Sequence, residues 1–186
     1  MSGAGDGGYG FKLVDETNVL IPDDVFKALV TIDEDGPRPV APADTMQALQ
    51  EVRLEKSVPL NVRRAFQMAL GAMAYAYWYY PLLTLAAQQI LRVADFASDI
   101  FARERGMDLQ YSLAARLKAL AKDGAVDELQ LRRWEGIRRL RNSATHPSFQ
   151  QIWGPAQAID VARAVADAIN TLPWASSPQD RPNQEA

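Results

Sequence analysis

The feature that most constrains this sequence is a long uncharged stretch from Ala65 to Leu91, with an arginine on either side. A stretch of that length could cross a bilayer. Pro81 lies inside it, however, and the aromatic residues of 75–80 lie near its middle, whereas membrane helices carry such residues at their ends. We therefore interpret the stretch as two buried helices separated at Pro81 and expect no membrane span.

Apolar residues recur at helical intervals on both sides of this break. The pattern predicts helices at about 60–79, 82–105 and 109–122, a fourth from Asp127 to the region of His146, and a last one from Pro155 to just before Pro173. No sustained alternation typical of strands follows residue 44. The predicted fold class is therefore all-α.

Residues near the helix ends support these boundaries. Asp127 and Gln130 have the spacing of a capping box, in which each side chain accepts a hydrogen bond from the backbone of the other residue. Asp108 is a candidate N-cap for the third helix, and Gly106 is a candidate C′ residue for the second.

The N-terminal part is predicted to be an arm, residues 1–58, packed on a helical domain of residues 59–174. Residues 11–14 and 19–21 have the composition of short strands or of an extended arm, and 36–39 (Gly-Pro-Arg-Pro) has that of a linker. Short helices are expected over residues 23–31 and from an N-cap at Asp44 to about residue 56. The polar tail, 175–186, is expected to be disordered.

Composition excludes several functions. The net charge is −3 and the isoelectric point is near 5.2, so any RNA-binding surface must be local. The chain has no cysteine and a single histidine, so we expect no metal site, and no cofactor-binding motif is visible. No signal-peptide pattern is present at the start, and we expect a cytoplasmic protein.

The segment Trp134–Pro147 carries the candidate chemistry. It holds His146, the only histidine, five residues after Arg141. On a helical wheel Leu129, Ile137, Leu140 and Ala144 share one face, and Arg141 falls between Ile137 and Trp134, where a solvated arginine is not expected. A guanidinium and an imidazole at the end of a partly buried helix can hold a phosphate and move a proton. Basic residues in the last turn also simply stabilise a helix dipole.

The residues Arg141-Asn142-Ser-Ala-Thr-His146 resemble the R-x(4–6)-H motif of the HEPN superfamily. The likeness extends to residues 117–124, just before the motif helix, and to residues 79–95, which resemble the first core helix of small HEPN proteins. It covers about residues 75–172. Many such families have a glutamate in that first helix, and the nearest acid here is Asp95, which is one methylene shorter.

This resemblance implies a four-helix bundle, about residues 82–172, with extra N-terminal helices. It implies a homodimer in which two motifs face one cleft, and a metal-independent endoribonuclease in a toxin–antitoxin or phage-defence setting. Arg141, Asn142 and His146 are then the catalytic candidates, with Asp95 in support. Arg132, Arg138 and Arg139 are candidate RNA-binding residues. A charged helix face is also often merely solvated.

Two other functions remain open. The chain could be a non-catalytic helical dimer that binds RNA or a protein such as an antitoxin, or a helical adaptor that matches the motif by coincidence. The aromatic and apolar side chains of residues 66–91 exceed what one short bundle should cover, which predicts a two-fold homodimer in any of these cases.

Overall fold

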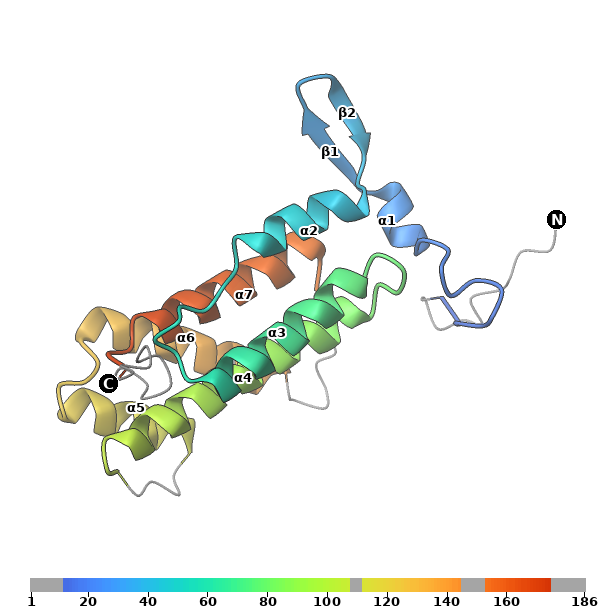
Figure 1. The fold of residues 1–186 in the computed structure, drawn as a ribbon. Helices are drawn as coiled ribbons and strands as arrows, with labels where there is room; N and C mark the ends of the chain where they lie inside the picture. Colours follow the sequence, from blue (N-terminus) through green and yellow to red (C-terminus); the bar gives the residue numbers. More distant parts are fainter. Residues whose placement is uncertain (1–11, 108–111, 145–152, 175–186) are drawn as a thin grey trace, which may run out of the picture.

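The computed structural model describes residues 12–107, 112–144 and 153–174. In these ranges the chain is mostly helical, with one small two-stranded sheet (Figure 1). The order of elements is α1 (Asp24–Ala28), β1 (Val30–Asp33), β2 (Gly36–Pro39), α2 (Pro42–Gln50), α3 (Leu60–Tyr75), α4 (Leu82–Glu104), α5 (Leu113–Lys122), α6 (Glu128–Ala144) and α7 (Pro155–Asn170).

The uncharged stretch forms most of α3, the turn that follows and the first half of α4, so the predicted break at Pro81 is confirmed. Helices α3 and α4 pack along each other as the longest hairpin of the fold, and α4 also contacts α5, α6 and α7 (Figure 1). No helix in the described ranges combines the length and apolar character needed to span a bilayer.

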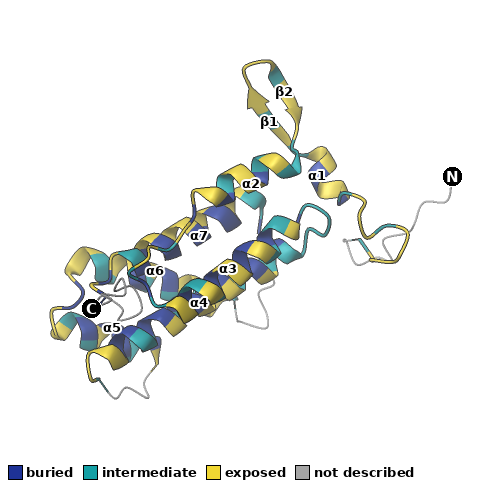
Figure 2. Cartoon of the chain, in the orientation of Figure 1, coloured by how far each residue is buried: buried dark blue, intermediate teal, exposed yellow. Residues whose placement is uncertain are grey.

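The core lies between these helices, and α4 is its centre. One broad side of α4 is buried, from Leu83 to Ala102, while its opposite side faces solvent (Figure 2). Large side chains from other helices complete the core, including Phe66 and Met73 from α3. The helix-period apolar spacing of the sequence therefore marks this buried side.

Two of the predicted helix ends are confirmed in detail. The backbone N–H of Asp127 donates to Gln130 Oε1 at 2.8 Å, and the backbone N–H of Gln130 donates to Asp127 Oδ1 at 2.7 Å, which forms the expected capping box of α6. Gly106 follows α4 with a φ of +73°, a conformation that favours glycine. Helix α5 is capped by Ser112, whose hydroxyl accepts from the Ala115 N–H, and Asp108 lies outside the described residues.

The N-terminal part differs from prediction in three ways. Residues 36–39 are a strand and not a linker, so the fold is not purely helical. Helix α1 ends at Ala28, because the chain continues directly into β1 instead of remaining helical to Thr31. Asp44 lies inside α2, which ends at Gln50, and accepts from the Ala41 N–H at 2.7 Å instead of being the N-cap itself.

Asp23 fastens α1 to the turn between α3 and α4. Its carboxylate is buried and accepts from the backbone N–H groups of Val25 and Tyr80, while its own N–H donates to the Tyr77 carbonyl. Phe26 packs at the same place, with its ring 5.2 Å from that of Tyr77. Further along, α2 packs on α3 and α7. The arm thus shares the apolar core of the bundle.

Candidate functional site

Helix α6 buries a narrower face than the wheel suggested. Trp134 and Ile137 are buried and Arg141 follows them on the same side, but Leu129 and Leu140 are exposed. The buried face is therefore centred on Trp134 and Ile137, with Arg141 partly buried at its end, and α6 contacts α4, α5 and α7. Leu129 and Leu140, which the wheel places on the same face as Ile137, are therefore outside the core, and Arg141 is partly buried.

Arg141 reaches across to Asp95 on α4. A terminal guanidinium nitrogen of Arg141 lies 2.7 Å from Asp95 Oδ2, with the Arg141 side chain 34% exposed and that of Asp95 24% exposed. One turn away the two helices are also joined by Gln88, whose amide donates to the Ala144 carbonyl at 3.2 Å. The side chain of Asp95, although one methylene shorter than that of glutamate, is therefore long enough to pair with Arg141.

Arg116 on α5 holds the other oxygen of the same carboxylate. Its guanidinium contacts Asp95 Oδ1, lies 3.3 Å from Asp99 Oδ1 and donates to Ser98 Oγ at 3.1 Å. The Arg116 side chain is only 7% exposed. We call Asp95, Ser98, Asp99, Arg116 and Arg141 the arginine–aspartate network, and it connects α4, α5 and α6.

Arg116 and Asp99 were missed in the sequence. The available signal was position, because Arg116 falls on the stripe formed by Leu113, Leu117 and Leu120, where burial is expected. A buried arginine needs a charged partner, since an unpaired charge taken out of water is strongly unfavourable. Searching neighbouring helices for acids one turn apart would have found Asp95 and Asp99.

The other arginines of α6 have different surroundings. Arg132 pairs with Glu128 at 2.5 Å and Arg138 with Glu135 at 2.6 Å, both within the helix, and Arg139 is exposed. Arg138 is half-buried and lies one turn before Arg141, whereas Arg132 and Arg139 lie along a different line of the helix.

Two further catalytic candidates follow Arg141. Asn142 is exposed in the last turn of α6. His146 lies outside the described residues, so its place relative to Arg141 stays a prediction.

Other kinds of site are not assembled near the network. Within the described ranges no group of three or more histidine, cysteine or acidic side chains is placed to hold a metal ion. A pocket lies at the far end of α4, lined by Phe101, Glu104, Arg105, Asp123 and Pro173. Burial there raises the pKa of Glu104 above its ordinary value. This pocket shares no residue with the network.

In the network, the partly exposed Arg141 is paired with the Asp95 carboxylate. The buried Arg116 contacts the other oxygen of that carboxylate. A guanidinium held like that of Arg141 can receive an anionic oxygen with little rearrangement. Comparison with family models, with curated proteins and with solved structures gives no match for this chain.

Proposed function

We propose that the protein is a metal-independent endoribonuclease of the HEPN type that acts as a homodimer. The observation that carries the proposal is the ion pair between Arg141 and Asp95. It fixes the arginine of the Arg-Asn-x-x-x-His motif at the C-terminal end of α6, in a partly exposed position. A solvated arginine with no structural role would not need that carboxylate.

Each motif residue has a role in this reaction. An unperturbed imidazole titrates close to neutral pH, which makes a histidine suitable to take the proton of an RNA 2′-hydroxyl, and we assign this role to His146. The 2′-oxygen bonds to the adjacent phosphorus, the bond from phosphorus to the 5′-oxygen breaks, and that oxygen takes up a proton that the imidazolium returns, directly or through water. Arg141 stabilises the negative charge that gathers on the phosphorane, and Asn142 orients the imidazole or a phosphate oxygen. The products are a 2′,3′-cyclic phosphate and a 5′-hydroxyl.

Asp95 and Arg116 are positioning residues in this scheme. Asp95 holds the Arg141 guanidinium in one orientation, and Arg116 holds Asp95 from the opposite side. Because the guanidinium does not have to be ordered when RNA binds, less binding energy is lost at the reaction step. Arg138, one turn before the motif, and the more exposed Arg132 and Arg139 supply phosphate contacts along the RNA.

The proposed dimer uses the exposed side of the α3–α4 hairpin. Met68 and Tyr75 on α3 and Leu85 and Phe96 on α4 are the large hydrophobic residues of these two helices that are exposed and could take part. Phe96 adjoins Asp95 in the sequence, so burying this side against a second copy brings two networks near one interface. Light scattering at tens of micromolar tests this, and a monomer mass would remove the shared cleft from the proposal.

A variant series tests the catalytic roles. We expect His146→Ala and Arg141→Ala to lose cleavage by a factor of about 10²–10⁴ while keeping the helical circular dichroism spectrum. Arg141→Lys should fail as well, because an ammonium cannot reproduce the planar fork. Arg139→Lys is the matched control on the exposed side of the same helix and should cleave like the wild type. Equal loss in both lysine variants would contradict the role of Arg141.

The balanced charges of the network favour a second candidate function. Two arginines and two aspartates linking three helices would also serve a bundle without catalysis, such as a non-catalytic dimer that binds RNA or an antitoxin. In that case Arg141→Lys, which keeps the charge, should leave RNA or partner binding nearly unchanged. RNA that stays intact with purified wild type, with and without divalent metal, would favour this second function.

A further inference from the structure

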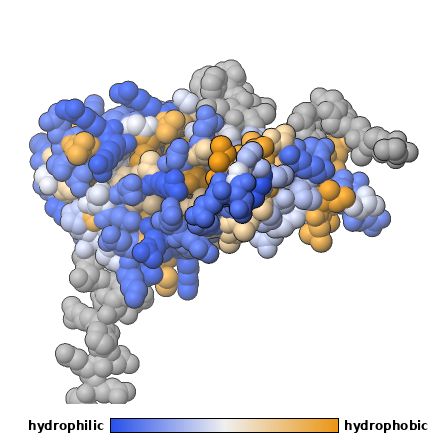
Figure 3. Space-filling view, turned by 90° about the horizontal axis from the view of Figure 1, so that it is seen from above, coloured by the Kyte–Doolittle hydropathy of each residue, from blue (hydrophilic) through white to orange (hydrophobic). Residues whose placement is uncertain are grey.

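The small sheet projects from the helical body and has one apolar face. Val30 and Ile32 on β1 stand opposite Pro39 and Pro37 on β2, so all four side chains share a face. Val30 is 61% exposed and Ile32 is 80% exposed, and both prolines are exposed too. The hairpin stands clear of the bundle (Figure 1), and the view from above shows hydrophobic residues on the surface directly beside hydrophilic ones (Figure 3).

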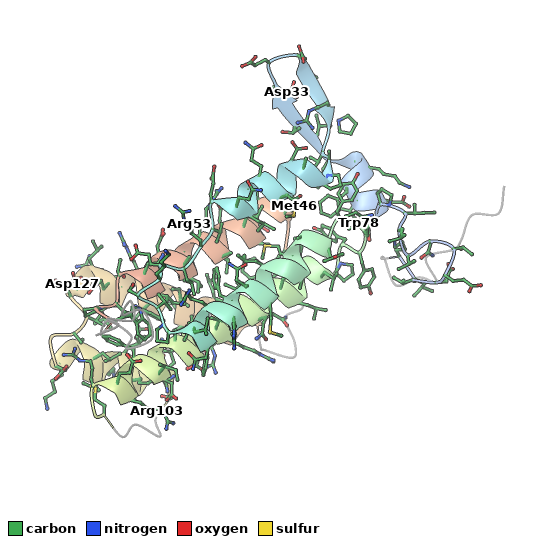
Figure 4. All side chains as sticks on the ribbon, in the orientation of Figure 1. Asp33, Met46, Arg53, Trp78, Arg103 and Asp127 are labelled. Atoms are coloured by element: carbon green, nitrogen blue, oxygen red, sulfur yellow. The ribbon has the colours of Figure 1, made fainter. Side chains whose placement is uncertain are left out.

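The opposite face of the hairpin is polar and tied down. Arg38 pairs with Asp33 across the strands at 2.5 Å and makes two hydrogen bonds to the Asp44 carboxylate on α2, at 2.7 and 2.8 Å. Asp33 is labelled near the tip of the hairpin in Figure 4. A two-stranded hairpin is marginal by itself, so this clamp keeps it formed and leaves the apolar face turned away from α2.

The two edges of the sheet are not equivalent. Hydrogen-bonded and non-hydrogen-bonded residue pairs alternate along an antiparallel sheet. Leu29 and Val40 form a hydrogen-bonded pair, because the Leu29 carbonyl accepts from the Val40 N–H, so Thr31 and Arg38, two residues along, form the next one. The two prolines of β2 occupy the non-hydrogen-bonded positions. The N–H and C=O groups of Val30 and Ile32 therefore point to the outer edge of β1. On β2 the corresponding residues are Pro37 and Pro39, which have no N–H. The outer edge of β2 therefore lacks backbone N–H donors at these positions, whereas the outer edge of β1 can pair with another strand.

The net charge around the hairpin indicates which kind of partner would bind there. Residues 12–44 contain eight acidic and three basic side chains, a net charge of −5, whereas the whole chain has −3. Glu34 and Asp35 are exposed at the hairpin tip. Two copies of this region would repel each other, while an extended segment with lysine or arginine would be attracted.

We infer that the outer edge of β1 is a docking site for a partner protein, which adds an extended segment with apolar residues at alternate positions and basic residues beside them. The backbone of the segment pairs with Val30 and Ile32, and its apolar side chains cover the face formed with Pro37 and Pro39. This site lies in the N-terminal arm and uses none of the residues proposed for RNA cleavage.

The test is selection of a random ten-residue peptide library against the full chain. Enriched peptides should alternate apolar residues and carry lysine or arginine. Binding should weaken about tenfold in Ile32→Pro, which removes one outward N–H, and by a similar factor in Ile32→Thr, which keeps the strand but removes apolar contact. Leu129→Thr, at an exposed apolar residue on α6, is the matched control and should bind normally.

Three results would overturn the inference. The first is enrichment of peptides that lack alternating apolar residues or lack basic residues. The second is equal peptide binding by the wild type and by both Ile32 variants. The third is a dimer of the wild type that Ile32→Pro converts to monomer, because this result assigns the edge to a second copy. Loss of peptide binding with RNA cleavage unchanged separates this site from the proposed nuclease function.

Discussion

Arg116→Met is the perturbation that most directly tests the arginine–aspartate network. The methionine keeps most of the buried apolar stem and removes the guanidinium that contacts Asp95, Asp99 and Ser98. Removing one partner of a fully buried ion pair destabilises a protein by about 3–5 kcal/mol. Here the two aspartates are about a quarter exposed and each keeps another arginine, Arg141 or Arg103. We therefore expect a smaller loss, about 2 kcal/mol.

The assay is equilibrium unfolding in urea, followed by circular dichroism, with the free energy of unfolding extrapolated to water. A loss of about 2 kcal/mol should lower the melting temperature by about 4–8 °C in a chain of this length. Arg103→Met is the matched control, because Arg103 pairs with the same Asp99 at 2.8 Å but its side chain is 64% exposed. Its expected loss is at most about 0.5 kcal/mol.

A double-mutant cycle separates the ion pair from general packing. Arg116→Met and Asp95→Asn should show a coupling free energy of about 1–2 kcal/mol, because the neutral asparagine no longer needs the buried guanidinium. If Arg116→Met destabilises the protein no more than Arg103→Met, or if the two changes in the cycle are additive, the buried guanidinium does not stabilise the network.

Three further predictions concern the N-terminal arm. Asp23→Ala should destabilise the docking of α1 by about 1–3 kcal/mol, since the partly buried Tyr80 N–H loses its acceptor. Faster amide exchange confined to residues 24–28 would report this loss, and unchanged exchange would contradict it. Hydrogen bonds from Arg38 and then from the Ala41 N–H lower the pKa of Asp44 from 3.8 to about 2, so the contribution of this carboxylate to stability is present above pH 3.8 and lost as pH falls through about 2. Carboxyl NMR titration should give that midpoint in the wild type and a higher one in Arg38→Ala, and equal midpoints would exclude the role of Arg38. A fragment of residues 1–58 should show no cooperative unfolding, because Phe26 and Leu49 are buried only in the shared core; a sharp transition would mean a separate domain.

Much of the helical architecture could be predicted because its signals are local. Proline at 81, the paired caps at Asp127 and Gln130 and the apolar spacing of α4 each act within one or two turns. The hairpin could not be predicted in the same way, because Gly36-Pro-Arg-Pro39 has the composition of a linker. It becomes a strand only when Arg38 is clamped to Asp44, a contact between two different elements.

The candidate site shows the same division. The position of Arg141 on the buried side of α6 could be read from the helical period. Its pairing with Asp95 could not, since it depends on how α4 and α6 cross, and neither could the shared use of that carboxylate by Arg116. Both contacts join helices that are distant in sequence, whereas single-helix patterns show only which side of each helix is buried.

We propose that this chain cleaves RNA through attack by a 2′-hydroxyl of the RNA itself. The most direct measurement is the number of 2′,3′-cyclic phosphate ends in total RNA incubated with purified protein in excess chelator. We predict that wild-type protein raises this number steadily with time and that the His146→Ala protein, purified identically, does not. Equal numbers of such ends with both proteins, or ends that form only after a divalent metal is added, would contradict the claim.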